Sequence, residues 1–153
     1  MRNNYFLLLL GIIVSTFISC QKTSINLSHQ FKNDIWNSFD DVELKTKIDI
    51  DKTYQLKVII YVKQDFEQPN FSFGFSQNSE DGESIYFNYK IPIKNKEGNF
   101  IENIENNVYK YILIIRNKTV FNSDGEYTFK FENLMNKYNV KGVHKIELQI
   151  IEI

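Results

Sequence analysis

Most of the chain alternates between apolar and polar residues with a period of two. Alternation of this kind places successive side chains on opposite faces of a strand, and the runs are rich in β-branched and aromatic residues. One further run, residues 109–115, is almost continuously apolar. The seven runs cover residues 42–48, 54–62, 71–75, 85–91, 109–115, 127–131 and 146–150. This pattern predicts an all-β domain.

Polar clusters rich in Asn, Asp and Gly separate these runs and predict turns. Strands with one apolar face bury it most simply when two sheets pack face to face. We therefore predict an antiparallel β-sandwich of about seven to eight strands, with a β-barrel as the alternative. The long polar gap at residues 94–107 predicts a crossover loop with a small edge strand. Residues 133–138 predict a helical turn or a loop.

The first residues follow a different pattern. Residues 5–18 are apolar apart from Ser15 and Thr16, and they follow a short start that contains Arg2. A helix over this segment would be roughly 21 Å long, whereas the hydrocarbon core of a membrane is about 30 Å thick. The layout therefore predicts a secretory signal peptide over residues 1–19.

The only cysteine of the chain, Cys20, directly follows this segment. The tetrapeptide Phe17-Ile18-Ser19-Cys20 resembles a bacterial lipobox, in which the peptide is cleaved before the cysteine. The thiol would then carry a diacylglycerol, with acyl chains such as palmitate, and two or three chains would give stable attachment. An ordinary cleaved signal, or a short anchor with an incidental cysteine, is the alternative.

The lipoprotein interpretation divides the chain into three segments. Residues 1–19 form the signal peptide, residues 20–28 the lipidated cysteine and its tether, and residues 29–153 a single β-sandwich domain. Gln21 follows the cysteine, in place of the Asp that retains many lipoproteins in the inner membrane. We therefore expect a lipid-anchored protein of the cell envelope, at the outer membrane and facing the periplasm.

The charge balance excludes one large class of partners. The chain has 18 basic and 19 acidic residues, and removal of Arg2 with the signal peptide leaves 17 against 19, or −2. Nucleic-acid binding needs concentrated positive charge, so we expect no nucleic-acid partner. The membrane, through the lipid, and proteins of the envelope are the expected partners, and the sequence leaves the oligomeric state open.

The sequence predicts no catalytic residue, cofactor or metal site. His29 and His144 stand 115 positions apart without metal-ligand spacing, so both are interpreted as surface histidines. No nucleophile elbow or phosphate-binding loop is present. Two acidic pairs, Asp40-Asp41 and Asp49/Asp51, could bind calcium, although such residues more often cap turns. We expect the protein not to be an enzyme.

Trp36 is the sole tryptophan and has two interpretations. An exposed ring could stack on a sugar, which would make the protein a carbohydrate- or ligand-binding lipoprotein. A large aromatic side chain just before the first clear strand more often packs at the end of the sandwich, and we favour packing.

The C-terminal region resembles the gliding motility lipoprotein H (GldH) family of Bacteroidetes, as a divergent member. The resemblance rests on Gly125-Glu126-Tyr127-Thr128-Phe129, Met135, Val140-Lys141-Gly142-Val143 and Ile146-Glu147-Leu148-Gln149-Ile150. Trp36 with Asp40, and Tyr54 with Leu56, are similar to the N-terminal half of the family. Asn133, Asn136, Lys145 and Glu147 depart from the family pattern.

The resemblance implies a non-enzymatic lipoprotein that serves gliding motility and the type IX secretion apparatus as an accessory or assembly component. Contact with a partner would use loops or a strand edge, for example by strand addition. The candidate interaction residues are Trp36, Met135 and Gly142.

Overall fold

The computed structural model describes residues 23–153. The predicted signal peptide and Cys20 lie outside the described residues. The described chain contains eleven strands and a single-turn 3-10 helix, η1 (Lys32–Asp34). The strands are β1 (Ser24–Gln30), β2 (Ile35–Asn37), β3 (Val42–Ile48), β4 (Tyr54–Val62), β5 (Asn70–Ser79), β6 (Ser84–Pro92), β7 (Ile104–Glu105), β8 (Val108–Thr119), β9 (Gly125–Asn133), β10 (Asn139–Lys141) and β11 (Val143–Glu152).

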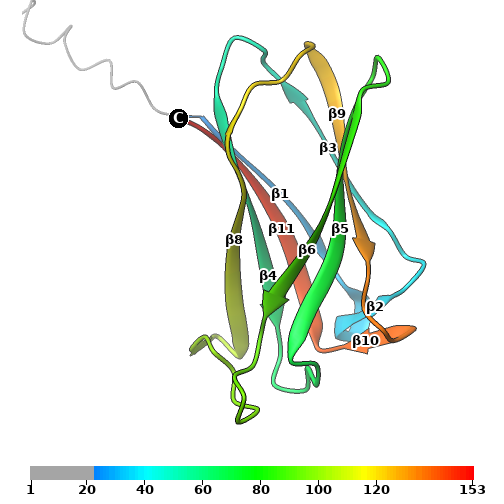
Figure 1. Ribbon diagram of the computed structural model, residues 1–153, viewed down its shortest axis with the longest axis vertical. Helices are drawn as coiled ribbons and strands as arrows, with labels where there is room; N and C mark the ends of the chain where they lie inside the picture. Colours follow the sequence, from blue (N-terminus) through cyan, green and yellow to red (C-terminus); the bar gives the residue numbers. More distant parts are fainter. Residues whose placement is uncertain (1–22) are drawn as a thin grey trace, which may run out of the picture.

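The strands form two large sheets and one short ribbon, and every pairing is antiparallel (Figure 1). The first sheet has the order β1-β11-β4-β8-β7, and the second sheet has the order β3-β9-β5-β6. Strands β10 and β2 pair only with each other. The predicted antiparallel β-sandwich is confirmed.

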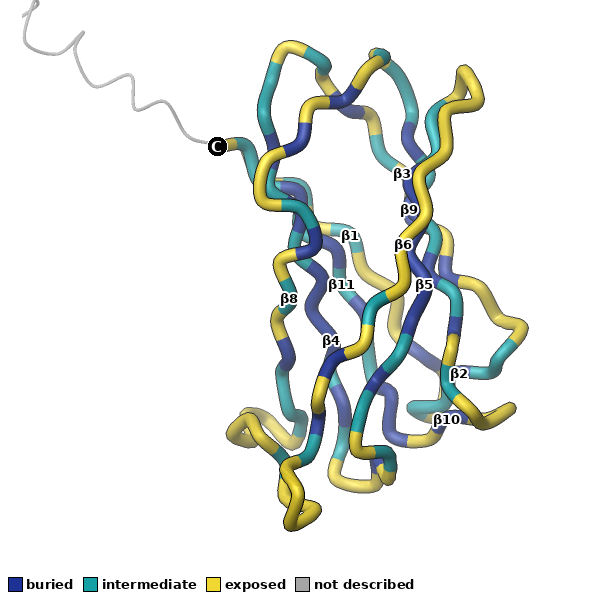
Figure 2. Tube along the Cα trace, viewed as in Figure 1, coloured by how far each residue is buried: buried dark blue, intermediate teal, exposed yellow. Residues whose placement is uncertain are grey.

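The core combines an aliphatic face with an aromatic face. Strands β4 and β11 of the first sheet bury Leu56, Val58, Ile60, Ile146, Leu148 and Ile150, each fully inaccessible. Strands β5 and β9 of the second sheet bury Phe71, Phe73, Phe75, Phe129 and Phe131. Each such side chain contributes about 1.5–3 kcal/mol when it leaves water, so this layer holds the two sheets together (Figure 2).

The sandwich has two distinct ends. The proximal end is where β1 begins and β11 ends, because Ser24 pairs with Ile151. The distal end carries the β2–β10 ribbon, and Figure 1 shows it at the opposite end of β1 and β11. β11 has ten residues, which at about 3.4 Å each separate the two ends by roughly 34 Å.

The structure corrects the boundary of the predicted tether. Residues 24–28, expected to be a flexible linker, belong to β1 and pair with residues 147–151 of β11. The strand is difficult to recognise in the sequence because β1 lies at the edge of its sheet, where only Ile25 and Leu27 are partly buried.

The irregular segments agree with the sequence only partly. The 94–107 gap contains the small edge strand β7 and a bridge between Lys94 and Phe100. Of residues 133–138, the predicted helical turn or loop, Asn133 is the last residue of β9 and residues 134–138 form a loop between β9 and β10. Across residues 23–153 no helix has the length and apolar character needed to cross a membrane.

Candidate functional site

The distal end gathers the residues that the sequence singled out, and Trp36 lies at its centre. Trp36 pairs with Val140 across the β2–β10 ribbon, and its ring is fully buried. The ring stacks between Phe31 at 5.0 Å and Phe71 at 5.7 Å, measured between ring centroids. Its Nε1–H donates to the carbonyl oxygen of Asp40 at 2.7 Å. Trp36 is therefore a packing residue, and its ring is not available to stack on a sugar.

Asn133, at the end of β9, ties this ribbon to the second sheet. Its Nδ2 group donates to the carbonyl oxygen of Trp36 at 3.1 Å, and its Oδ1 accepts the backbone N–H of Met135 at 2.8 Å. Met135 in turn lies half-buried against the core, and its sulfur accepts the backbone N–H of Ser72 at 3.0 Å. Asn133 and Met135 thus act as internal supports.

Gly142 forms the corner between β10 and β11 and has no side-chain role. Its φ of +80° lies in the left-handed region, which favours glycine. A Cβ atom there would lie 2.5 Å from the backbone nitrogen of Phe66. Its carbonyl oxygen accepts the backbone N–H of Lys63 at 2.8 Å. The glycine lets the β4–β5 loop approach the corner closely.

A charged cluster joins η1 to this corner. The Asp34 carboxylate accepts a hydrogen bond from His144 Nδ1–H at 2.6 Å. It also forms an ion pair with Lys63 Nζ at 2.7 Å. Asp34 and Asn33 both have a φ of 55°, so the local backbone is strained to bring the carboxylate into place. Burial alone would raise the pKa of Asp34, but the hydrogen bonds from Lys63 and His144 outweigh it and the pKa is lowered.

His144 is thus not the isolated surface histidine that the sequence indicates. Its side chain is 27% exposed, and its partner Asp34 lies 110 positions away in the chain. A histidine oriented by a carboxylate is a component of many catalytic sites. Among residues 23–153 no hydroxyl or thiol side chain hydrogen-bonds to His144. The contacts of Asp34 join η1 to Lys63, directly after β4, and to His144 of β11.

The two acidic pairs considered as calcium ligands are far apart. Asp40 and Asp41 precede β3 at the distal end, whereas Asp49 and Asp51 follow β3 at the proximal end. Asp41 pairs with Lys130 at 2.8 Å. In the region of the chain that the structure describes, no three His, Cys, Asp or Glu side chains are placed to share a metal ion.

Two aromatic side chains project from the distal end, and we call them the aromatic tip: Phe39 and Tyr138. They are 82% and 62% exposed, and their rings meet edge to face at 5.7 Å. The loops that carry them are joined because the Ser38 N–H donates to the Tyr138 carbonyl oxygen at 2.8 Å. Ser38 Oγ also donates to the carbonyl oxygen of Lys137 at 2.8 Å. The tip is therefore displayed on a fixed base.

Sequence reasoning missed this tip. Phe39 and Tyr138 lie in polar loops, outside any periodic run, so the pattern that identifies core residues does not reach them. The signal that could have found them is an aromatic residue alone in a polar turn, since such a ring has no packing partner in its own element. Exposed aromatic side chains are typical of protein interfaces.

Comparisons with known proteins give a family, together with several solved structures of low similarity. No curated protein matches the chain. The chain is similar to the dimeric latent PorU of Porphyromonas gingivalis at 11% identity and a TM-score of 0.40, covering 86% of this chain and 13% of that chain. It is also similar to the enzymatically active domain of tailspike protein 4 of bacteriophage CBA120, at 12% identity and a TM-score of 0.33. That match covers 88% of this chain and 20% of that chain.

A structure of infectious bursal disease virus, strain Gx, gives 10% identity and a TM-score of 0.33 over 88% of this chain and 37% of that chain. Similarity at this level carries no functional argument. The sequence model of the GldH lipoprotein family, by contrast, matches residues 24–150, from the first residue of β1 into β11. The chain therefore belongs to the GldH lipoprotein family.

Proposed function

We propose that this protein is a lipid-anchored, non-enzymatic accessory or assembly component of the gliding motility and type IX secretion apparatus, which holds a protein partner at its distal end. The observation that carries the proposal is the position of the aromatic tip beside the β2–β10 ribbon, which Figure 1 shows at the opposite end of the sandwich from the start of β1. An anchor at Cys20 would leave this end as the region of the domain farthest from the attachment point.

The arrangement favours an adaptor. Members of a lipoprotein family are membrane-anchored in the cell envelope, and anchoring raises the effective concentration of the domain toward neighbouring envelope proteins. We place the anchor in the outer membrane, with the domain facing the periplasm. The distal end then stands roughly 34 Å above the attached end when β11 is upright. A rigid aromatic pair at that height provides the anchor residues that protein interfaces commonly use.

The carbohydrate-binding alternative depended on an exposed Trp36. Because that ring is fully buried and its N–H is bonded to Asp40, the alternative loses the residue on which it rested.

Lipidation is tested first. A clickable fatty acid supplied to the cells should label the wild-type protein, whereas Cys20→Ser should take up no label and leave the membrane fraction. Retention of label in Cys20→Ser would refute the anchor at this position.

The partner role is tested by complementation of a deletion strain. Deletion should abolish colony spreading and reduce secreted cargo, and the wild-type gene should restore both. The double variant Phe39→Ser, Tyr138→Ser should fail to restore them although it is made and lipidated normally. The matched control is Val120→Ser, which removes a 60% exposed apolar side chain at the proximal end. Normal spreading of the deletion strain would sink the apparatus role, and full complementation by the double variant would sink the role of the tip.

A further inference from the structure

The free edge of the second sheet is a separate feature from the aromatic tip. β6 pairs with β5 from Asn70↔Pro92 to Asn78↔Ser84 without a register shift, and β6 is the last strand of its sheet. At the two ends of this ladder, Ser79 N–H donates to the Glu83 carbonyl and Ile93 N–H donates to the Pro69 carbonyl.

Residues of an antiparallel strand alternate between neighbours, so odd-numbered residues of β6 bond to β5. The backbone N–H and C=O groups of the even-numbered residues then point to the free edge, where no strand pairs with them. These residues are Ser84, Tyr86, Asn88 and Lys90.

Residues 84–89 of this edge lack the usual protection, which Lys90 and Pro92 supply only at its distal end. Natural edge strands carry charges, prolines or bulges that discourage pairing with another chain. The opposite edge of the same sheet, β3, follows this rule, with Glu43, Lys45 and Lys47 exposed along it. In β6, residues 84–89 contain no charge and no proline. They instead expose Ile85, Tyr86 and Phe87 at 37%, 47% and 39%.

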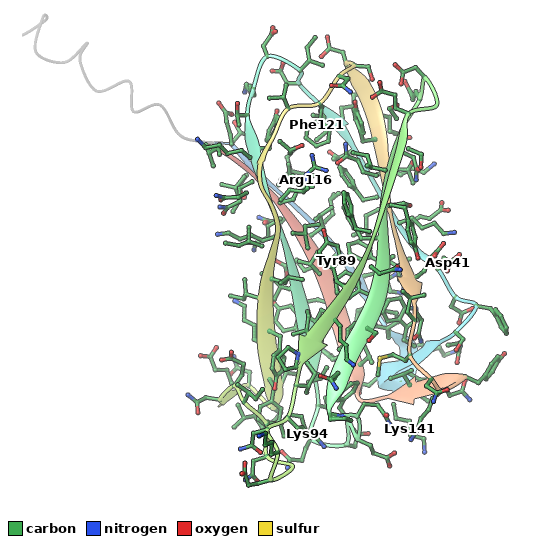
Figure 3. The ribbon with its side chains drawn as sticks, in the orientation of Figure 1. Asp41, Tyr89, Lys94, Arg116, Phe121 and Lys141 are labelled. Carbon is green, nitrogen blue, oxygen red and sulfur yellow. The ribbon has the colours of Figure 1, made fainter. Side chains whose placement is uncertain are left out.

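The inward-facing side chains of β6 are covered by the first sheet along only part of the strand. Phe87 and Ile85 lie opposite the buried Phe75 and Gln77, so they face the layer between the sheets. Toward the distal end, two hydrogen bonds connect this side of the second sheet to β8 of the first sheet. The Tyr89 hydroxyl donates to the Ile115 carbonyl at 3.3 Å, and the Tyr111 hydroxyl donates to the Ile93 carbonyl at 2.7 Å. Toward the proximal end, Arg116 of β8 lies over the Phe87 ring at 5.7 Å (Figure 3). Phe87 and Ile85 stay partly exposed there because no neighbouring strand covers them.

Beside this stretch, one buried oxygen accepts no hydrogen bond and one arginine forms no ion pair within the described residues. Gln77, opposite Ile85, is 6% exposed, and its buried Oε1 accepts no hydrogen bond within the described chain. Such a group costs free energy until a donor reaches it. Arg116 donates to Thr119 Oγ1 at 3.2 Å but forms no ion pair with any carboxylate of residues 23–153. Within the described residues, Gln77 Oε1 therefore lacks a hydrogen-bond donor and Arg116 lacks an anionic partner.

We propose that β6 receives an extended segment of a partner protein as an added strand. The segment pairs with the outward backbone groups between Ser84 and Lys90. Its inward side chains are apolar and cover Ile85 and Phe87, except for one Asp or Glu that meets Arg116. Its other side chains are polar because they face solvent. This site is distinct from the aromatic tip and does not depend on which envelope machine supplies the segment.

The test uses the full lipidated protein in the cells that make it. A benzophenone amino acid at Lys90, on the free edge, should form a light-dependent adduct with another protein. The same group at Lys45, on the protected β3 edge, should form none. Mass spectrometry of the Lys90 adduct should map to a segment that alternates apolar and polar residues and contains an acidic residue.

A matched pair of variants tests the backbone contact. Asn88→Pro removes an N–H that points to the free edge, and proline is tolerated at such positions. Asn88→Ala keeps the N–H and removes only the side chain. Adduct yield from Lys90 should fall about tenfold with Asn88→Pro and stay within about twofold with Asn88→Ala. Arg116→Glu should lower the yield, whereas Arg116→Lys should not.

Four results would overturn the proposal. The first is an adduct from Lys45 as strong as that from Lys90, and the second is an unchanged yield in a folded Asn88→Pro. The third is a partner segment without the alternation, and the fourth is an adduct with the mass of two copies of this chain. If Asn88→Pro fails to fold by circular dichroism, the opposite effects of Arg116→Glu and Arg116→Lys decide the question.

Discussion

The two ends of the sandwich are closed in the same way but present different surfaces. At the distal end, Trp36 stacks with Phe31 and Phe71. At the proximal end, Phe121 meets Tyr54 at 5.5 Å and Tyr127 at 4.7 Å. In both places buried aromatic rings plug the gap between the sheets, which is a requirement of folding.

The difference lies outside the plugs. The turns of the proximal end are mainly polar and charged, with the Tyr54 and Tyr127 hydroxyls donating to the carbonyls of Asp49 and Ser123. The distal end adds Phe39 and Tyr138, which the fold does not bury. Aromatic content alone therefore does not distinguish the two ends, whereas the exposure of aromatic rings on joined loops does.

The largest effect on the free energy of unfolding is expected from the buried aromatic residues that close the two ends of the sandwich. Trp36→Ala should lower the free energy of unfolding by about 4–5 kcal/mol, because it leaves a large cavity and frees the Asp40 carbonyl. Phe121→Ala should cost about 3–4 kcal/mol for the same reason at the other end. Denaturant unfolding of the mature protein measures both. A cost below about 1 kcal/mol for either variant would break the equivalence of the plugs.

The distal corner should be nearly as sensitive. Gly142→Ala combines left-handed strain with a contact to the Phe66 backbone, so we expect a loss of about 3–4 kcal/mol. The matched control is Gly82→Ala in the β5–β6 turn, where φ is +93° but the space for a Cβ atom is open. It should lose only about 1–2 kcal/mol. Equal losses in the two variants would show that close approach to Phe66 does not matter.

A smaller, pH-dependent effect should come from Asp34. Its pKa lies below the ordinary value of 3.8 in the folded state, so its contribution is present above the unfolded pKa. That contribution is lost as the pH falls below about 4. Asp34→Asn should therefore cost about 1–2 kcal/mol at neutral pH, with the difference from wild type shrinking toward pH 3. Urea titrations at several pH values give this difference, and one that stays constant with pH would contradict the assignment.

The smallest effect on stability is expected at the aromatic tip. Phe39→Ser and Tyr138→Ser should each change the free energy of unfolding by less than about 0.5 kcal/mol, since both rings are mostly in water. Thermal unfolding of these two variants, measured beside Trp36→Phe, compares the loss of an exposed ring with a change to a buried ring at the same end. A large loss at the tip would mean that it belongs to the fold.

The sequence predicts the long central strands well because burial of one face makes every second residue apolar. β4 is the clearest case, with Tyr54, Leu56, Val58, Ile60 and Val62 all buried. β1 is not predicted because its alternation is short, with only Ile25 and Leu27 apolar and partly buried in an otherwise polar segment. The β2 and β10 strands are three residues each, and each needs a partner about a hundred positions away.

The candidate site is predicted less well for a related reason. Trp36, Met135 and Gly142 all lie at the distal end, but their roles depend on contacts with other regions of the chain. The Asp34–His144 pair joins residues 110 positions apart, which spacing along the sequence cannot reveal. Phe39 and Tyr138 become a pair only once the two loops are joined through Ser38.

The antiparallel pairing of β1 with β11 has a mechanical consequence. A pull on the N-terminal side of Ser24, resisted by a partner at the distal end, runs nearly parallel to the strands. The seven register pairs from Ser24↔Ile151 to Gln30↔Lys145 then bear the load together, in shear, and do not open in succession like a zipper. A domain anchored at its N-terminal side would therefore resist a force applied along its strands.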